Sequence, residues 1–462
     1  MPRTPLIVVS NRLPVTVKRT RGRTDRVRSS GGLVSAFEPL LERRGGLWIG
    51  WPGTELKQGE TLSDPDDSYE IVPVHVPRGD VRGYYNGFSN RTLWPVFHSL
   101  PSEAHFRERE WEAYERVNQR FADAVAQHAP EGASVIVNDY HLTLLPALLA
   151  AQGRRDIAVG YFLHIPFPPY DVFRVLPWAR RLLRGMLGAD LVGFHTQNYV
   201  QNFLECSARL VGAEVQQGRG LVTVESRTTR VVSLPLGIDF QRYESLAMSV
   251  PKKDEPSERV VLGVDRLDYT KGIPERLHAF ARLLENHPEQ RGEVAMVQLA
   301  VPSRSEVREY RDLKREIDEL VGRINGRFAT ETWTPIRYLY RSVSPERLAA
   351  MYRDADVGFV TPLRDGLNLV AKEFVACQVA NPGVLVLSHM AGSAETMREA
   401  LRVNPYNIED TADKLHRALT MPRAERAHRM ERLRRREKRR DVHAWANQLL
   451  RRLTTAIASN QR

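Results

Sequence analysis

The sequence predicts an α/β protein with two doubly wound, Rossmann-like domains. Short runs of Val, Ile and Leu, which are typical of strands buried on both faces, alternate with segments of helical periodicity. The alternation stops after Arg230 and begins again near Arg259, beyond a polar, proline-containing connection at residues 250–257. A chain of 462 residues is also too long for one ordinary hydrophobic core. We therefore expect two parallel sheets with helices on both faces.

The expected strands fall into two groups, one in each half of the chain. The first half has strands at residues 6–10, 135–137, 159–163 and 191–194, and the second half at residues 260–264, 293–300, 336–340, 357–361 and 384–388. Pro235 and Gly237 close the first half, so we predict domains over residues 1–237 and 238–440. In sheets of this kind ligands bind outside the carboxyl ends of the strands. The residues that follow each strand are therefore the candidates for a binding site.

The loop after the strand at residues 260–264 carries two cations. Arg266 and Lys271 stand between this strand and a helix whose first turn contains Pro274, a position that tolerates proline. The unpaired amides of a helix N-terminus favour an anion, and the two cations add to that preference. We interpret Arg266 and Lys271 as a clamp for a diphosphate. Solvated surface charge is the alternative interpretation.

The junction after the strand at residues 357–361 has the same character. Gly366 permits a close approach of the backbone to a ligand, and the amides at the start of the following helix are expected to point at a phosphate. Asp365 can hold a sugar hydroxyl, and Glu373, one helical turn beyond Leu369, can reach a ribose. The alternatives are that Asp365 is a helix cap and that Glu373 is a solvated charge.

Polar residues also follow the strands of the first half. Arg12 follows the first strand, where a phosphate can bind, and a glycine-rich turn containing Gly32 leads into a helix. Asp139 and His164 each follow a strand. A histidine can donate a hydrogen bond to developing charge, and an aspartate can orient a hydroxyl. For His141 and His195, at similar positions, a satisfied polar residue at a strand end is a serious alternative.

Aromatic residues of the first half are candidates for contact with a sugar. Trp48, Trp51, Tyr84, Tyr85 and Trp94 are expected in loops, where their rings can pack on sugar faces and their polar atoms can donate hydrogen bonds. Packing in the hydrophobic core is the alternative for each of them.

Composition limits the remaining function classes. The net charge of +11 owes much to an arginine-rich stretch at residues 423–440, which favours a solvated helical face over nucleic-acid binding because it contains no aromatic residue for base stacking. No apolar run is long enough for a signal peptide or a membrane span, so we expect a cytoplasmic protein. Cys206 and Cys377 lack metal-ligand spacing and fit simple packing in a reducing compartment. The dinucleotide and phosphate-loop glycine signatures are missing, and no metal site is predicted.

Taken together, these residues resemble the trehalose-6-phosphate synthases, a family of retaining glycosyltransferases with the two-domain GT-B architecture. The resemblance extends from about Leu6 to about Pro405. It rests on the motifs Ser10-Asn-Arg-Leu-Pro14, Ser30-Gly-Gly-Leu33, Tyr85-Asn-Gly-Phe-Ser-Asn90, Leu93-Trp-Pro95, Asp139-Tyr-His-Leu142, His164-Ile-Pro-Phe-Pro168, Gly193-Phe-His-Thr196, Val264-Asp-Arg-Leu-Asp-Tyr-Thr-Lys-Gly272, Arg337-Tyr-Leu-Tyr-Arg341 and Thr361-Pro-Leu-Arg-Asp-Gly366.

The resemblance implies that the second domain binds UDP-glucose and that glucose 6-phosphate is the acceptor. The implied donor-binding residues are Gly32, Arg266, Lys271, Asp365, Gly366, Asn368, Leu369, Val370 and Glu373; the acceptor-binding residues are Arg12, Tyr85, Trp94, Asp139 and Arg304; and the catalytic residues are Asp139, His164, Arg266 and Lys271. It also implies that a helix at about residues 441–462 packs back on the first domain.

The implied reaction transfers glucose on the front face of the donor and gives α,α-trehalose 6-phosphate and UDP. The leaving phosphate itself takes the acceptor proton, so no pair of catalytic carboxylates is needed. Arg266 and Lys271 stabilise the charge that grows on this phosphate. The resemblance implies no cofactor beyond UDP-glucose as co-substrate, no metal, and no nucleic-acid or membrane partner. The oligomeric state stays open, a homo-oligomer included.

Departures from the family pattern leave alternatives open, and one of these departures is a slightly altered stretch at Val379-Ala-Asn-Pro-Gly383. Asn138 replaces the usual residue before Asp139, and the loop at residues 388–397 is altered where it can line the donor site. The same fold with ADP- or GDP-glucose as donor, or with glycerol 3-phosphate as acceptor, is therefore an alternative. A catalytically silent sugar-phosphate sensor is a further one, and nucleic-acid binding through residues 423–440 is another.

Overall fold

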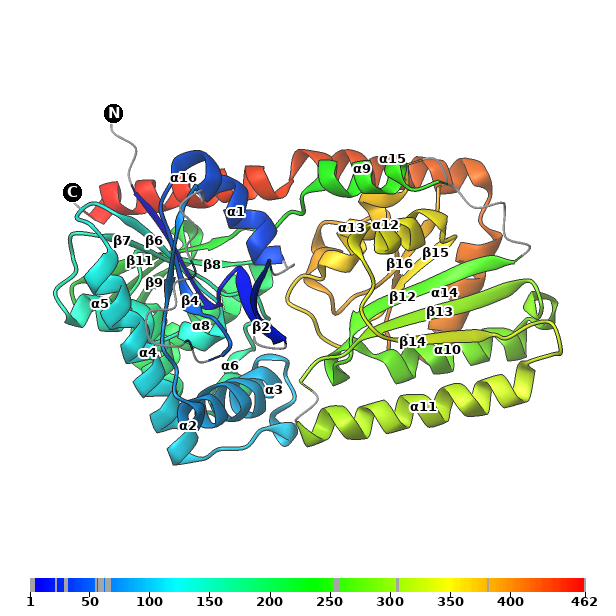
Figure 1. Ribbon diagram of the computed structural model, residues 1–462, viewed down its shortest axis with the longest axis horizontal. Coiled ribbons are helices and arrows are strands. Elements are labelled where there is room, and N and C mark those ends of the chain that lie inside the picture. Colours follow the sequence, from blue (N-terminus) through cyan, green and yellow to red (C-terminus); the bar gives the residue numbers. More distant parts are fainter. Residues whose placement is uncertain are drawn as a thin grey trace. The chain divides into compact units, whose positions relative to one another are not determined.

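The computed structural model describes residues 5–20, 23–28, 32–54, 56, 62, 68–251, 258–304, 307–379 and 382–460. The chain divides into two compact units (Figure 1). Unit 1 is Met1–Leu236 together with Val442–Arg462, and unit 2 is Gly237–Asp441. This division differs by one residue at each junction from the boundaries that we placed after residues 237 and 440.

Unit 1 is built on a nine-stranded sheet in the order β5-β4-β1-β6-β7-β8-β11-β10-β9. All neighbours from β5 to β11 are parallel, and β10 and β9 are added as antiparallel strands. The strands are β1 (Leu6–Arg12), β4 (Leu47–Trp51), β5 (Glu70–Pro73), β6 (Ser134–Asn138), β7 (Ala158–Phe162), β8 (Leu191–Phe194), β9 (Glu214–Gln216), β10 (Leu221–Val224) and β11 (Arg227–Ser233), with a separate hairpin of β2 (Val15–Thr20) and β3 (Arg23–Arg28).

The helices of unit 1 include one that comes from the far end of the chain. The α-helices are α1 (Gly32–Arg44), α2 (Arg78–Val81), α3 (Trp94–Phe97), α4 (Glu108–His128), α5 (Leu145–Ala151), α6 (Tyr170–Phe173), α7 (Ala179–Met186), α8 (Gln197–Val211) and α16 (Val442–Asn460). Trp445 of α16 is buried, donates from Nε1 to the carbonyl of Leu234 at 3.0 Å, and packs edge-on against Phe37 and Phe162. The C-terminal helix therefore completes the core of unit 1.

Unit 2 contains a six-stranded parallel sheet in the order β14-β13-β12-β15-β16-β17. Its strands are β12 (Arg259–Arg266), β13 (Val294–Val301), β14 (Ile336–Tyr340), β15 (Val357–Val360), β16 (Val384–Ser388) and β17 (Leu401–Val403), and its α-helices are α9 (Phe240–Ser249), α10 (Ile273–Asn286), α11 (Arg308–Phe328), α12 (Pro345–Asp354), α13 (Leu369–Cys377), α14 (Ile408–Thr420) and α15 (Arg423–Arg439). Helices α10, α11 and α14 cover one face of the sheet and α9, α12, α13 and α15 the other (Figure 1). Each face carries its own hydrophobic core, as the near-continuous apolar strands require.

The prediction that the aromatic residues of the first half lie in loops was wrong. Trp48 and Trp51 belong to β4, and Tyr84 and Tyr85 lie in a π-helical segment, η1 (Arg82–Leu93). Its glycines pack closely on α4. A Cβ at Gly83 would lie 2.6 Å from the Cβ of Ala113, so only glycine permits this approach of the two helices.

The arginine-rich stretch forms α15, and many of its cations are paired within unit 2. Arg436 makes two hydrogen bonds to the carboxylate of Glu399, and Arg434 pairs with Glu244 at 2.5 Å. Lys372 of α13 and Glu437 of α15 form an ion pair at 2.7 Å that is almost completely buried. Much of this helix therefore holds unit 2 together, whereas the sequence had favoured a solvated face.

Candidate active site

The strand order of unit 2 reverses between β12 and β15. Strands β13 and β14 lie on one side of this junction and β16 and β17 on the other. Such a reversal is where open α/β sheets bind their ligands, at the carboxyl ends of the strands. Arg266 is the last residue of β12, Lys271 ends the short 3-10 turn η5 (Tyr269–Lys271), and Asp365 follows β15. The two junctions that the sequence singled out thus lie at the reversal.

Lys271 and Asp365 form an ion pair that joins these two junctions. Nζ of Lys271 lies 2.6 Å from Oδ2 of Asp365, and the two side chains are 11% and 13% exposed. Asp365 also accepts from Nδ2 of Asn368 at 3.1 Å. The backbone of the loop after β16 holds it from the other side, because Asp365 N donates to the carbonyl of Met390 and Gly392 N donates to that of Asp365. Asp365 is therefore fixed beside a cation.

The helix cap at this junction is Asn368 and not Asp365. The side chain of Asn368 accepts from the amide of Ala371 at 3.0 Å, so the cap alternative for Asp365 was wrong. The amides of Leu369 and Val370, at the first two helical positions, have no intrahelical acceptor by geometry. The N-terminus of α13 can therefore bind an anion beside Lys271. Gly366 lies buried between Asp365 and this helix.

A buried arginine of α10 contacts the backbone of the loop that carries Lys271. Arg276, in the first turn of α10, pairs through Nη1 with Oδ2 of Asp265 at 2.5 Å, and both side chains are almost fully buried. Its Nε donates to Oγ1 of Thr361, and Nη2 reaches the carbonyl of Lys271 at 3.3 Å. One guanidinium thus connects β12, the end of β15 and the Lys271 loop.

Arg304, a predicted acceptor residue, is held against a buried carboxylate of unit 2. Its side chain is 7% exposed; Nη1 lies 3.4 Å from Oδ2 of Asp268 and donates to the hydroxyl of Tyr310. Burial raises the pKa of Asp268, but the charges of Arg304, Lys271 and Arg266 outweigh burial, so this pKa lies below its usual value. Asp268 therefore remains ionised and positions Arg304.

Glu373 is not a solvated charge. It is half-buried in α13 and accepts hydrogen bonds from the hydroxyl of Tyr352, at 2.9 Å, and from that of Tyr243. Burial raises the pKa of Glu373, and the two hydroxyls act in the opposite direction. The two hydroxyls hold the carboxylate in place. Each carboxylate oxygen has a second lone pair, so a ribose hydroxyl can still donate to it.

In unit 1 the strand order reverses between β1 and β6, and predicted residues again follow the strands. Arg12 is the last residue of β1, and its guanidinium lies over the ring of Trp51, 4.8 Å from the centroid. A Cβ at Gly53 would lie 2.0 Å from the guanidinium nitrogens, so this position leaves room for Arg12. The stacking orients a cation at the carboxyl edge of the sheet.

Asp139 and His164 meet directly after β6 and β7. Oδ1 of Asp139 accepts from the amide of His164 at 3.2 Å. Nε2 of His164 lies 3.0 Å from Oδ1 of Asn138, the residue that departs from the family pattern. Burial, and then the neighbouring His195, lower the pKa of His164 well below its usual value. His164 is therefore a neutral imidazole at neutral pH.

The other two predicted residues of unit 1 have aromatic neighbours. The ring of Tyr85 stacks on His141 with centroids 5.8 Å apart. Trp94 is only 4% exposed and packs against His98 and Tyr140, so most of its ring belongs to the core. Gly32 is the first residue of α1. The roles predicted for Gly32, Tyr85 and Trp94 stay predictions.

Backbone strain coincides with the predicted residues. Among the described residues, five other than glycine have positive φ angles, and three of these are Asp139 at 74°, Arg304 at 46° and Asn368 at 77°. Such conformations cost about 1–3 kcal/mol each and persist where the surroundings impose them, most often at functional sites. They support the positions of the site residues independently of their chemistry.

Comparison with known proteins decides the family. Residues 4–455 match the model of glycosyltransferase family 20. The chain belongs to this family. It is 44% identical to the trehalose-6-phosphate synthase of Mycobacterium avium (strain 104), over 96% of this chain and 94% of that protein.

Solved structures of family 20 are similar in fold as well. A structure from E. coli, bound with UDP-2-fluoro glucose, covers 97% of this chain and 99% of its own at 35% identity, with a TM-score of 0.91. The UDP-forming α,α-trehalose-phosphate synthase of Burkholderia xenovorans, in complex with glucose-6-phosphate, covers 97% and 100% at 35% identity, with a TM-score of 0.88. The predicted GT-B fold class is confirmed.

Three residues of this family 20 site were missed by the sequence prediction. Asp268 positions Arg304, Arg276 contacts the carbonyl of Lys271, and Asn138 orients His164. Arg276 carried a usable signal, because it falls four residues before Phe280 on the apolar face of its helix, where a solvated arginine is not expected. Asp268 and Asn138 carried none that spacing alone reveals.

Proposed function

We propose that this protein transfers glucose from UDP-glucose to glucose 6-phosphate and forms α,α-trehalose 6-phosphate and UDP. The observation that carries the proposal is the ion pair of Lys271 and Asp365 at the reversal of the unit 2 sheet, beside the N-terminus of α13. The cation and the helix suit a diphosphate, and the carboxylate suits the hydroxyls of a transferred sugar. Family membership, and the substrates in the E. coli and Burkholderia structures, support the same pair of substrates.

The proposed transfer retains the configuration of the anomeric carbon. The bond between this carbon and the diphosphate oxygen breaks while a bond to the acceptor hydroxyl forms on the same face. The acceptor proton passes to the leaving phosphate, whose growing charge Arg266 and Lys271 stabilise. Asp365 holds the transferred glucose and Glu373 the ribose. Catalysis is then chiefly positioning, in which Asp139 and neutral His164 orient the sugars.

The two cations proposed for the acceptor phosphate each have a fixed neighbour within their own unit. Arg12 is stacked on Trp51, and Arg304 is anchored by Asp268 and Tyr310. A guanidinium can bind a phosphate through two parallel hydrogen bonds, so both residues suit the 6-phosphate of the acceptor. Tyr85 and Trp94 complete the proposed acceptor site.

We also propose which cofactors and partners the enzyme needs. The reaction needs no metal and no cofactor other than UDP-glucose, and the enzyme acts in the cytoplasm on small molecules without a nucleic-acid or membrane partner. Among the described residues, no helix combines the length and the apolar character that a membrane crossing demands. Whether the enzyme forms a homo-oligomer is a separate question, which sedimentation answers.

The decisive experiment measures UDP release from UDP-glucose with and without glucose 6-phosphate, with EDTA present, and identifies the product by NMR. We expect release that depends on the acceptor and an α,α-linked disaccharide phosphate. The proposed substrates are contradicted if the protein releases nucleotide only from ADP- or GDP-glucose and not from UDP-glucose. They are also contradicted if glycerol 3-phosphate, and not glucose 6-phosphate, is the acceptor that stimulates release. Nucleotide binding without turnover of any donor contradicts the proposed activity and indicates a sensor.

A further inference from the structure

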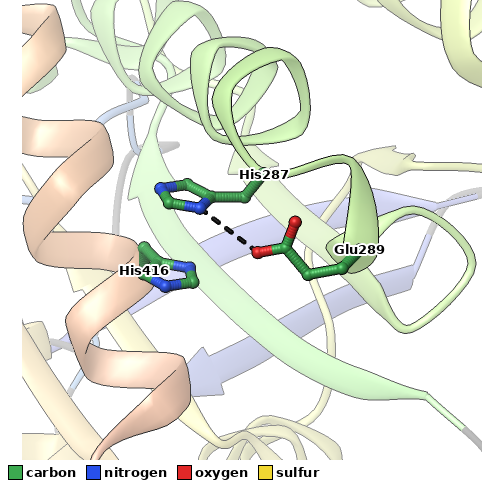
Figure 2. A group of neighbouring side chains, drawn as sticks. All are labelled: His287, Glu289 and His416. Carbon is green, nitrogen blue, oxygen red and sulfur yellow. Dashed lines mark hydrogen bonds and ion pairs between the residues drawn. The ribbon is translucent and has the colours of Figure 1, made fainter.

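Three side chains with metal-binding chemistry meet in unit 2, away from the site described above. His287 follows the last residue of α10, Glu289 lies in the short turn η6 (Pro288–Gln290), and His416 is in α14. One nitrogen or oxygen atom from each lies within 4.8 Å of the other two. Figure 2 shows the two rings and the carboxylate gathered between α10 and α14.

The cluster is well separated from the candidate active site. Lys271 lies just before α10, and His287 lies just after its 14 residues. A helix of this length spans about 20 Å, so the two sites are at opposite ends of α10. Arg259 lies at the start of β12, at the amino edge of the unit 2 sheet. Its guanidinium donates hydrogen bonds to Gln290, next to Glu289, and to the carbonyl of Leu419 in α14. The cluster is therefore at the amino edge of the sheet.

The two imidazole rings of the cluster are stacked on each other. Their rings stack with centroids 3.5 Å apart and planes 4° from parallel, and Nδ1 of His287 lies 3.2 Å from Oε1 of Glu289 (Figure 2). Two imidazolium rings would repel each other at this spacing. Burial, and then His287, lower the pKa of His416. Neutral imidazole is the form that binds a metal ion, so the lowered pKa of His416 favours its ligand form.

One atom of the cluster lacks a partner. Within the part of the chain that the structure describes, Nδ1 of His416 is a buried atom without a hydrogen bond. A buried polar atom without a partner costs about 1–3 kcal/mol, and a ligand that reached it would recover this energy. Glu289 is exposed and can turn toward such a ligand.

We propose that His287, Glu289 and His416 bind one divalent transition-metal ion, with Zn²⁺ as the best fit. Two imidazole nitrogens and one carboxylate oxygen are a common Zn²⁺ ligand set, and a water molecule completes the tetrahedron. Mg²⁺ and Ca²⁺ do not fit, because they prefer oxygen ligands alone. Tetrahedral ligands lie about 3.3–3.5 Å apart, so the cluster must close by about 1 Å and the stacked rings must turn toward the ion.

The bound ion would connect the end of α10 with α14. It binds only the folded state, so it stabilises unit 2 by mass action. The site is structural in this proposal, since it lies at the opposite end of α10 from Lys271. The proposal therefore does not rest on the proposed transferase function, and the metal-independent reaction proposed above is compatible with it.

The test is isothermal titration of the chelator-treated full-length protein with Zn²⁺, repeated with Co²⁺ to record its visible spectrum. We expect one equivalent of Zn²⁺ to bind, a rise in Tm, and the intense visible absorption of tetrahedral Co²⁺. His416→Gln and Glu289→Gln should each weaken binding at least about tenfold. Glu289→Gln is informative even if His416→Gln fails to fold, because Glu289 is on the surface. His278→Gln is the matched control, because His278 is an exposed histidine of α10 outside the cluster. This variant should bind Zn²⁺ as the unaltered protein does.

Two results overturn the proposal. One is Zn²⁺ binding weaker than about 1 mM. The other is tight binding that neither His416→Gln nor Glu289→Gln changes. In both cases the two histidines are only a packing contact between the end of α10 and α14.

Discussion

Oδ1 of Asn138 accepts a hydrogen bond from Nε2 of His164 at 3.0 Å, and the rest of the asparagine amide leaves no other arrangement. Nδ2 of Asn138 donates to the carbonyls of Val9 and Ile136, at 3.1 and 3.2 Å. The oxygen must therefore face His164, so His164 carries its proton on Nε2 and keeps Nδ1 as an acceptor. The residue that departs from the family pattern thus selects one tautomer.

Replacing Asn138 with Leu should remove the hydrogen bond that fixes the proton of His164 on Nε2. We expect kcat to fall about tenfold while the KM for UDP-glucose changes little, because a positioning partner is lost and the donor site is not touched. Histidine-selective ¹⁵N NMR should show both tautomers of His164. Asn118→Leu is the control, since Asn118 is equally buried but bonds elsewhere. A single Nε2–H tautomer in Asn138→Leu would contradict the assignment.

Asp365→Asn separates sugar recognition from diphosphate recognition. The carboxylate is proposed to hold the transferred glucose, whereas Lys271 serves the diphosphate. We expect kcat/KM for UDP-glucose to fall about 100-fold and the inhibition constant of UDP to change less than about threefold. Steady-state kinetics with UDP as inhibitor measures both. Equal weakening of UDP and UDP-glucose would show that Asp365 serves only to position Lys271.

Arg304→Ala should affect the acceptor alone. Loss of a charged hydrogen bond to a phosphate costs about 1.5–3 kcal/mol, so the KM for glucose 6-phosphate should rise at least about tenfold with that for UDP-glucose unchanged. Tyr310→Phe removes one anchor of Arg304 and should act in the same direction but less strongly. Arg308→Ala, four residues further along and highly exposed, is the control. The acceptor assignment fails if only the UDP-glucose KM rises.

Breaking the Asp265–Arg276 pair should destabilise unit 2. Arg276→Met leaves an unpaired buried carboxylate, and we expect a loss of about 3–5 kcal/mol in the free energy of unfolding. The double variant Asp265→Leu/Arg276→Met removes both charges and should recover most of this loss. Urea denaturation of the three proteins measures the difference. A double variant as unstable as the single one would argue that packing, and not charge, dominates here.

His164 should make the protein sensitive to mild acid. Its pKa is lowered in the folded state, so below the usual histidine value of 6.5 the unfolded chain binds a proton that the folded chain does not. The contribution of His164 to stability is therefore constant above about pH 6.5 and falls as the pH drops below it, by up to about 1.4 kcal/mol per pH unit. His164→Asn should flatten this part of the stability profile between pH 5 and 7. If the free energy of unfolding of His164→Asn falls with pH as steeply as that of the unaltered protein, groups other than His164 cause the acid sensitivity.

The sequence predicted the strands of both sheets well where the strands are apolar on both faces. Strand β6, for example, was expected at residues 135–137 and spans Ser134–Asn138. The short strands β4 and β5 were missed, and the tryptophans of β4 had been assigned to loops. Trp48 is in fact fixed in the core, where Nε1 donates to Oγ of Ser10 at 2.8 Å.

The candidate site was predictable where its residues follow strands and not where they act through other residues. Lys271 and Asp365 could be found because strand ends are local features of the sequence. Asp268, Arg276 and Asn138 could not be assigned roles, because their partners are set by tertiary packing. The same holds for Tyr352, whose contact with Glu373 depends on how α12 and α13 pack.

Helix α16 has a consequence for the order of synthesis. Unit 1 contains residues from both ends of the chain, and Trp445 lies against Phe162 and within 6.3 Å of the ring of His164. A ribosome that has produced residues 1–441 has therefore supplied all of unit 2 but only an incomplete unit 1, with the apolar surface around Phe37 and Phe162 still uncovered. Unit 2 can finish folding during translation, whereas the aromatic packing behind His164 must wait until α16 has been made and can dock. A chain that ends before Val442 should consequently be captured by chaperones or proteases through unit 1, even though every residue of its donor junction is present.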